Sequence, residues 1–244
     1  MAAQRVGMQN TPDLTHFFAI HRKMRIDTRR FARAVETATA DDRRGRLVPL
    51  SRWAKGFAFE LDEHHFVEDT YFFPELRERI PSAGAFLDEL DADHRVVDDI
   101  LSRWTGVARR LADPSVPFAP AREEALDMAV GLRDLLQRHL DIEDHHILPL
   151  YWRHYSTAEF DAVYQQAVKG GKKKGLSFVV PWNVLCLEPA HQATLVELAP
   201  MPLKVVWWMT RGRFRRLEAA AFAGIDVDLA DLADLDDLAD NPTA

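Results

Sequence analysis

The segments HHFVEDTYFFP (residues 64–74) and HLDIEDHHILP (residues 139–149) are two copies of one pattern. In each copy a His is followed four residues later by a Glu and then at once by an Asp, and a Pro closes the segment. The aligned pairs are His64 with His139, Glu68 with Glu143, Asp69 with Asp144, and Pro74 with Pro149. Side chains four residues apart share one face of a helix, so each copy presents an imidazole and a carboxylate to the same point. Transition metals bind to such pairs.

The repeat extends to a whole helical hairpin. His21 precedes His64 by 43 residues, and His94 precedes His139 by 45 residues. Apolar residues at helical spacing predict four long helices with short connections, over about residues 11–40, 49–79, 82–111 and 122–152. We expect Pro74 to kink or tighten the last turns of the second helix. The pattern is typical of an all-α fold, an up-down-up-down four-helix bundle with additional C-terminal helices.

The repeated motifs predict a buried metal site. One His-x-x-x-Glu pair is weak evidence, but here it occurs twice in register, and each copy follows a lone His at a matched distance. Burying these groups without partners would cost several kcal/mol each, and coordination removes that cost. The predicted ligands are His21, His64, Glu68, His94, His139 and Glu143.

Mixed imidazole and carboxylate ligands suit iron or manganese, and the chain lacks the thiolates of a cysteine-type zinc site. Two carboxylates can bridge two ions, and four imidazoles can divide between them. This leaves positions for an oxo or hydroxo bridge and for an exogenous ligand, which predicts chemistry with O2, peroxide or NO.

Residues 14–155 resemble the hemerythrin-like family, also called the HHE cation-binding domain. His21, His64-x-x-x-Glu68, His94 and His139-x-x-x-Glu143 match its signature one by one. The resemblance implies a four-helix bundle with a non-haem di-iron centre, that is, two iron ions that bind O2 or react with peroxide or NO.

Two positions depart from the oxygen-carrying members of that family. Where they have a second His in the third helix, this chain has Asp98, and where they use Asp in the fourth helix, it offers both Glu143 and Asp144. Fewer imidazoles and more carboxylates favour ferric iron, so we expect peroxide handling or sensing rather than O2 storage.

Other polar residues are candidates for extra ligands or for neighbours of the ligands. His65 is read first as a histidine satisfied elsewhere, and Arg25 as a residue of a solvated face. Tyr71 and His146 lie seven residues after a ligand His and are expected to face inward. The candidates of this kind are His65, Tyr71, Asp98, Asp144 and His146.

The sequence divides into three predicted parts. Residues 11–155 form the bundle, residues 156–224 a C-terminal helical extension packed on it, and residues 225–244 an acidic, disordered tail. The segment 169–175 reads as a flexible basic linker. Trp207 and Trp208 precede an arginine-rich stretch, which favours packing on the bundle over contact with a membrane or a protein partner.

The bulk composition narrows the function. A net charge of −7 argues against nucleic-acid binding, and the single Cys186 favours a reducing compartment. No signal-peptide pattern and no apolar run long enough to span a membrane is found, so we predict a cytoplasmic protein.

Three functions remain open from the sequence. The first is a di-iron protein that binds or decomposes a small oxidant, with catalase- or peroxidase-like peroxide decomposition favoured. The second is an iron- or oxygen-responsive sensor without turnover, whose C-terminal region contacts a protein partner. The third is a ferritin-like oxidase that uses Glu143-x-x-His146.

Overall fold

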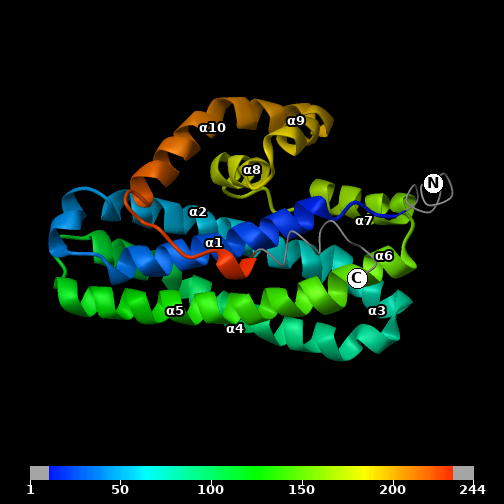
Figure 1. Ribbon diagram of the computed structural model, residues 1–244, viewed down its shortest axis with the longest axis horizontal. Coiled ribbons are helices and arrows are strands. Elements are labelled where there is room, and N and C mark those ends of the chain that lie inside the picture. The colour runs from blue at the N-terminus through cyan, green and yellow to red at the C-terminus, as the bar shows by residue number, and fades with distance from the viewer. Residues whose placement is uncertain (1–10, 233–244) are drawn as a thin grey trace.

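The computed structural model describes residues 11–232, and all the regular structure in that range is helical (Figure 1). Four long helices run up, down, up and down, which confirms the predicted fold class. The close neighbours are α2 with α4, α4 with α5, and α5 with α1. The bundle helices are α1 (Thr15–Glu36), α2 (Leu47–Val67), α4 (Gly84–Ala112) and α5 (Phe118–Ile142), and α2 and α5 continue into α3 (Phe73–Arg79) and α6 (Leu148–His154).

Both copies of the repeated motif contain a π-helical turn, η3 (Glu68–Phe72) and η5 (Glu143–Ile147). In these turns the N–H groups of Phe73 and Leu148 donate to the carbonyls of Glu68 and Glu143, five residues back. The proline that follows has no N–H, and its ring clashes with the carbonyl four residues earlier. The expected tightening at Pro74 is therefore wrong, because this turn contains one residue more than an α-helical turn, and the expected kink stays a prediction.

The hydrophobic core consists of two clusters. Along each bundle helix, the predicted donor residues lie between members of the first cluster and members of the second. On α1, for example, His21 lies between Phe18 of one cluster and Met24 of the other. A polar layer therefore crosses the bundle between two apolar blocks that shield it from water at both ends.

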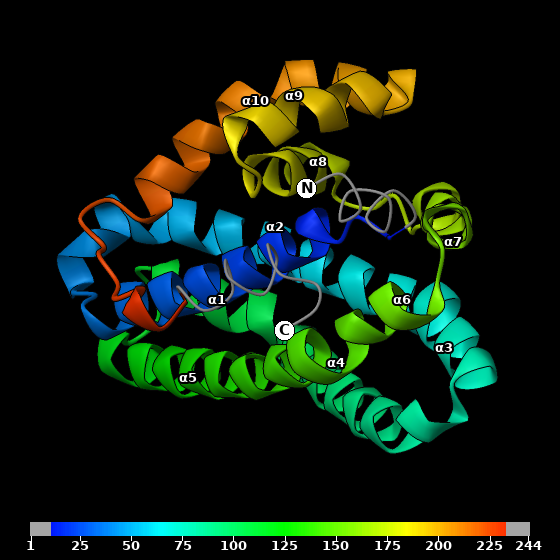
Figure 2. The ribbon, with the colours of Figure 1, turned by 45° about the vertical axis from the view of Figure 1, so that its right-hand side comes forward.

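The C-terminal helices cover the side of the bundle where α1 and α2 are neighbours (Figure 2). The backbones of α1 and α2 approach each other less closely than the other neighbouring pairs, and α8 and α10 pack against α2 there. We call this side the α1–α2 seam. The fully buried Trp182 of α8 packs on Phe57 and donates its indole N–H to Asp27 of α1 at 2.8 Å. The C-terminal helices are α7 (Thr157–Gly170), α8 (Leu176–Leu185), α9 (Pro189–Leu198) and α10 (Met201–Ala221).

The basic linker is held on the surface of α2 rather than free of it. The backbone N–H of Lys172 donates to both oxygens of Glu63, and its ammonium donates to Asp62 at 2.7 Å. A Cβ at Gly171 would lie 2.1 Å from Glu63 Oε1, and Gly175 has a φ of +61° beside Phe59. Only glycine fits these two positions without strain, so the glycines serve close packing instead of the predicted flexibility.

The first residues of the predicted acidic tail contact the bundle. Arg29 donates to the backbone oxygen of Asp228 at 3.4 Å, and Leu232 is buried. Residues 233–244, for which we predicted disorder, lie outside the described part of the chain. The three domain boundaries stay predictions.

Within residues 11–232, no helix combines the length and the apolar character that crossing a bilayer requires.

The buried Glu60 should make the stability of the protein depend on pH. Glu60 Oε2 accepts from Asn183 at 2.7 Å across the seam, and burial raises the pKa of Glu60 from 4.5 to about 8. The folded chain keeps this proton while the unfolded chain loses it, so stability falls as pH rises from about 4.5 to about 8. Glu60→Gln removes this decline and should raise the free energy of unfolding at pH 8 by roughly 1–3 kcal/mol.

Denaturant unfolding at a series of pH values measures this effect. Glu123→Gln, a change at an exposed acid of α5, should leave the pH dependence as it is. An identical pH slope in Glu60→Gln and the unmodified chain would contradict the assignment.

Candidate metal centre

Seven buried side chains meet in the polar layer and form two groups that share Glu68. In each group, every residue offers one donor atom, and these atoms lie within 4.8 Å of one another. The two groups are His65, Glu68, His94 and His139, and His21, His64, Glu68 and Glu143. The six predicted ligands are thus brought together from α1, α2, α4, α5 and the two π-turns. Each group contains enough donors for one metal ion.

The two carboxylates lie between the groups. Glu68 has Oε1 3.1 Å from His64 Nε2 and Oε2 3.6 Å from His94 Nε2. Glu143 has Oε1 3.4 Å from His139 Nε2 and Oε2 3.5 Å from His21 Nε2. Each carboxylate therefore faces one imidazole of each group, which is the arrangement that a carboxylate bridging two ions requires.

The atoms that face the centre lack hydrogen-bond partners among the described residues. They are Nε2 of His21, His64, His65, His94 and His139, Oε2 of Glu68, and both carboxylate oxygens of Glu143. A buried polar group without a partner costs several kcal/mol. A bound cation would satisfy all of these atoms at once, and nitrogen and carboxylate donors fit iron or manganese. The residues present therefore fit a metal pair.

Carboxylates form hydrogen bonds to the outer ring nitrogens of two imidazoles and lie near that of a third. The Nδ1 atoms of His21 and His94 lie 2.7 Å from Asp144 and 2.8 Å from Asp69, and Nδ1 of His139 lies 3.6 Å from Asp93. A carboxylate at this position keeps the ring hydrogen on Nδ1, which leaves the Nε2 lone pair directed at the centre. Asp69 and Asp144, the aligned residues of the two motifs, thus have matching roles.

A buried arginine supports one of these carboxylates. The Arg25 side chain is 1% exposed, its Nη1 is 2.9 Å from Asp144 Oδ2, and its Nη2 is 2.9 Å from Asp141. The expectation that Arg25 lies on a solvated face is therefore wrong. Asp144 contacts His21 and Arg25 and belongs to neither donor group.

The electrostatics of the metal-free centre follow from burial. Burial lowers the pKa of His64 to about 3, helped by His21, so this imidazole is neutral. Burial raises the pKa of Glu68 well above 4.5, and Glu143 raises it further. Burial opposes protonation of His139, but Glu143 and Asp93 outweigh it and raise the pKa of His139 to about 9. His139 is therefore protonated near neutral pH in the absence of a metal, and Glu68 keeps its proton to a higher pH than an exposed carboxyl group.

His65 belongs to the first donor group, although the sequence favoured a role elsewhere. It is 3% exposed, and its ring stacks on His94 at a centroid distance of 4.0 Å. The available signal was its spacing of three residues before Glu68, which also places two side chains on one helix face. With His65 the centre contains five imidazoles, so the argument from a histidine-poor site against O2 storage loses its premise.

Three other candidates lie away from the centre. Asp98 is exposed, His146 is exposed and stacks on Phe86 at 4.3 Å, and Tyr71 is half-buried with its hydroxyl against Gly170. Tyr71 and His146 lie within the π-turns, which shift the helix phase by one residue. The next residues, Phe72 and Ile147, are the ones buried in the core. The expectation of an inward-facing side chain is therefore wrong for His146, whereas Tyr71 meets it only as packing against the second apolar cluster.

Sequence reasoning did not identify Tyr151, a buried phenol on α6. It is 2% exposed, its hydroxyl donates to the carbonyl of Phe72 at 3.5 Å, and its ring packs edge-on to the Phe72 ring. Burial raises the pKa of Tyr151 well above 10, and the charges of Glu68 and Glu143 add to this. Tyr151 therefore keeps its proton.

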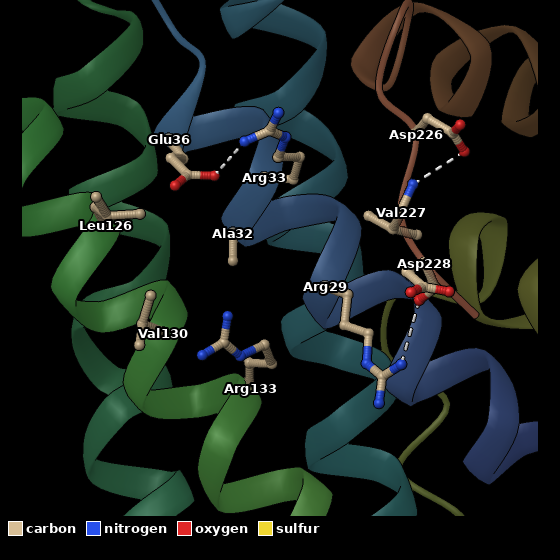
Figure 3. A pocket seen from close by; sticks show the side chains of 10 residues that line it. All are labelled: Arg29, Ala32, Arg33, Glu36, Leu126, Val130, Arg133, Asp226, Val227 and Asp228. Atoms are coloured by element: carbon tan, nitrogen blue, oxygen red, sulfur yellow. Dashed lines mark hydrogen bonds and ion pairs between the residues drawn. The ribbon is translucent and has the colours of Figure 1, made fainter. Parts of the chain in front are cut away.

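A surface pocket of about 370 Å³ lies elsewhere, between α1, α5 and residues 226–228 (Figure 3). Its arginines are matched by acids or polar atoms: Arg33 pairs with Glu36, and Arg29 donates to Asp228. The ten residues that line it are Arg29, Ala32, Arg33, Glu36, Leu126, Val130, Arg133, Asp226, Val227 and Asp228. None of them belongs to either donor group, so we assign this pocket no part in the metal chemistry.

Comparison with known proteins agrees with the geometry. The model of the hemerythrin HHE cation-binding domain matches residues 13–151, more than half of the chain. This chain belongs to the hemerythrin family. An uncharacterized hemerythrin-like protein of Schizosaccharomyces pombe is 26% identical over 143 residues, which are 58% of this hemerythrin-like chain and 60% of the yeast protein. No solved structure matches.

Replacing Arg25 should destabilise the fold. Arg25→Gln leaves Asp144 buried without its cation, which should cost roughly 3 kcal/mol of unfolding free energy. Arg103→Gln is the matched control, because Arg103 is 61% exposed and pairs with the exposed Asp99, so its loss should cost less than about 1 kcal/mol. Urea unfolding at equal metal content measures both, and equal effects would contradict a buried ion pair.

Metal binding should release protons. An ion that binds His139 displaces the proton that this imidazole holds below about pH 9, and an ion that binds Glu68 displaces the proton that burial retains there, so the affinity for Fe²⁺ should increase with pH. Anaerobic calorimetric titrations in two buffers of different ionisation enthalpy count the released protons. An affinity that does not change between pH 6 and pH 8 would contradict the electrostatics described above.

Proposed function

We propose that this hemerythrin-family chain holds two iron ions and binds or reacts with a small oxidant, hydrogen peroxide, O2 or NO. The observation that supports this most directly is the position of Glu68 and Glu143, each between one imidazole of each donor group. Two ions held in this way would share both carboxylates.

The imidazoles divide unequally between the two donor groups. His65, His94 and His139 would hold one ion, and His21 and His64 the other, with Glu68 common to both groups. Glu143 faces His21 with one oxygen and His139 with the other, so it could also be shared. When bound, the iron pair would supply reversible electron transfer and open coordination positions.

The surrounding residues suit oxidant chemistry. The two apolar clusters keep bulk water from the layer, which strengthens every electrostatic interaction within it. Carboxylates shared by two ions favour ferric iron, which keeps peroxide decomposition as the leading reaction, while the five imidazoles keep O2 binding within the proposal.

The second candidate function is sensing without turnover. His21 and His64 lie on α1 and α2, the two helices that α8 joins through Trp182 at the seam. Metal loading at that position would therefore act on the packing of the C-terminal helices, where a protein partner would bind. The ferritin-like alternative finds no support, because His146 is exposed and is outside both donor groups.

Anaerobic iron loading tests the proposal. We expect about two irons per chain, and near-ultraviolet bands of a ferric pair that appear in air and change when peroxide or azide is added. His65→Ala should weaken binding of one iron by roughly 10–100-fold or more, whereas the control His146→Ala should leave iron content and spectrum unchanged.

A chain that stays metal-free and colourless after loading would rule the proposal out. Oxygen evolution from hydrogen peroxide separates the two candidate functions: turnover supports the reactive centre. Negligible turnover, together with a large metal-dependent change in protease sensitivity of α8 to α10, supports the sensor.

A further inference from the structure

An apolar patch lies at the corner between α9 and α10. Its five large side chains are 43–78% exposed, and among the other large apolar residues that the structure describes only Val96, at 51%, falls in this range. The patch consists of Leu198, Met201, Val205, Trp208 and Met209. Exposed apolar side chains that gather in this way mark an interaction site, whereas scattered ones need no explanation.

The fold does not need this patch for its own packing. Trp207, Phe214 and Ala221, at intervals of seven residues, are the buried residues of α10, which packs on α2 and α8. Met201, Val205 and Trp208 follow the i, i+4, i+7 spacing of a different face of the helix and are exposed. Helices α9 and α10 form the outermost layer on this side of the molecule (Figures 1 and 2).

Basic side chains accompany the patch. Between Glu197 and Glu218 the chain has no acidic residue, although its net charge is −7. The arginines of this stretch are all exposed, and they follow the apolar part of α10 toward its C-terminal end. The basic residues of the stretch are Lys204, Arg211, Arg213, Arg215 and Arg216. Positive charge is thus separated from the rest of an acidic protein and placed beside exposed apolar side chains.

We propose that this face of α9 and α10 docks on the surface of an anionic lipid bilayer. The patch would lie at the boundary between headgroups and acyl chains, with the Trp208 indole at headgroup level. The arginines would bind lipid phosphates and benefit from the negative surface potential of the leaflet. The protein lies on the membrane in this arrangement and does not cross it.

Other occupants fit the surface less well. Nucleic acid would engage the arginines but would leave Met201, Val205 and Met209 without apolar contacts. A second copy bound through the same face would bring two sets of arginines together, and like charges repel across an interface. An anionic bilayer with an apolar interior matches both parts of the face.

Vesicle co-sedimentation of the full chain tests the proposal. Vesicles of phosphatidylcholine with phosphatidylserine should bind the protein, binding should weaken with salt, and phosphatidylcholine alone should bind it poorly. Arg215→Gln with Arg216→Gln should weaken binding roughly thirtyfold. Trp208→Ser with Met209→Ser should weaken it by at least a similar factor.

The controls change exposed residues on another face of the molecule. Arg103→Gln with Arg109→Gln removes two exposed charges of α4, and Val96→Ser removes an exposed apolar side chain of the same helix, so binding should not change. Absence of vesicle binding, or equal binding by all variants, overturns the proposal. Self-association or nucleic-acid binding that depends on Trp208 or Arg215, without vesicle binding, overturns it as well and assigns the face to that partner.

Discussion

The fold is organised around a polar layer that is cut off from water. Five imidazoles and two carboxylates direct atoms without hydrogen-bond partners at one region between two apolar clusters. Such a layer is unstable unless its charges are matched. At the outer side of the layer, Asp144, Asp69 and Asp93 balance the imidazoles, and the buried Arg25 balances Asp144. The atoms at the inner side would be balanced by a bound cation. Folding, metal affinity and the number of bound protons therefore depend on the same residues.

The sequence was most informative where the repeat imposed a local rule. Four-residue spacing placed each His and Glu on one helix face, and the doubled pattern predicted the bundle and the meeting of its hairpins. The rule did not place Tyr71 and His146, because a proline can be accommodated in a helix by a π-turn, which shifts the side chains that follow by one residue. Both copies of the motif contain such a turn, so the same change explains the position of both residues.

Rules of local spacing could not predict interactions between segments that are distant in the sequence. The contacts of Arg25 with Asp144, of Glu60 with Asn183 and of Trp182 with Asp27 join residues more than a hundred positions apart. No periodicity marks them, since each is a single polar contact in an apolar setting. His65 was within reach, because a spacing of three residues is as good as four, but two adjacent histidines cannot both lie at the centre of one helix face.

The α1–α2 seam has a consequence for how the centre is held. His65, His94 and His139 lie on α2, α4 and α5, which pack directly in the order α2, α4, α5. His21 and His64 lie on α1 and α2, which approach each other less closely and are both contacted by the Trp182 side chain. The two halves of the centre are therefore supported unequally: one lies between helices that pack directly on each other, and the other depends on the C-terminal helices that cover the seam. A substitution in α8 can therefore alter the half that contains His21 and His64 without changing any donor residue.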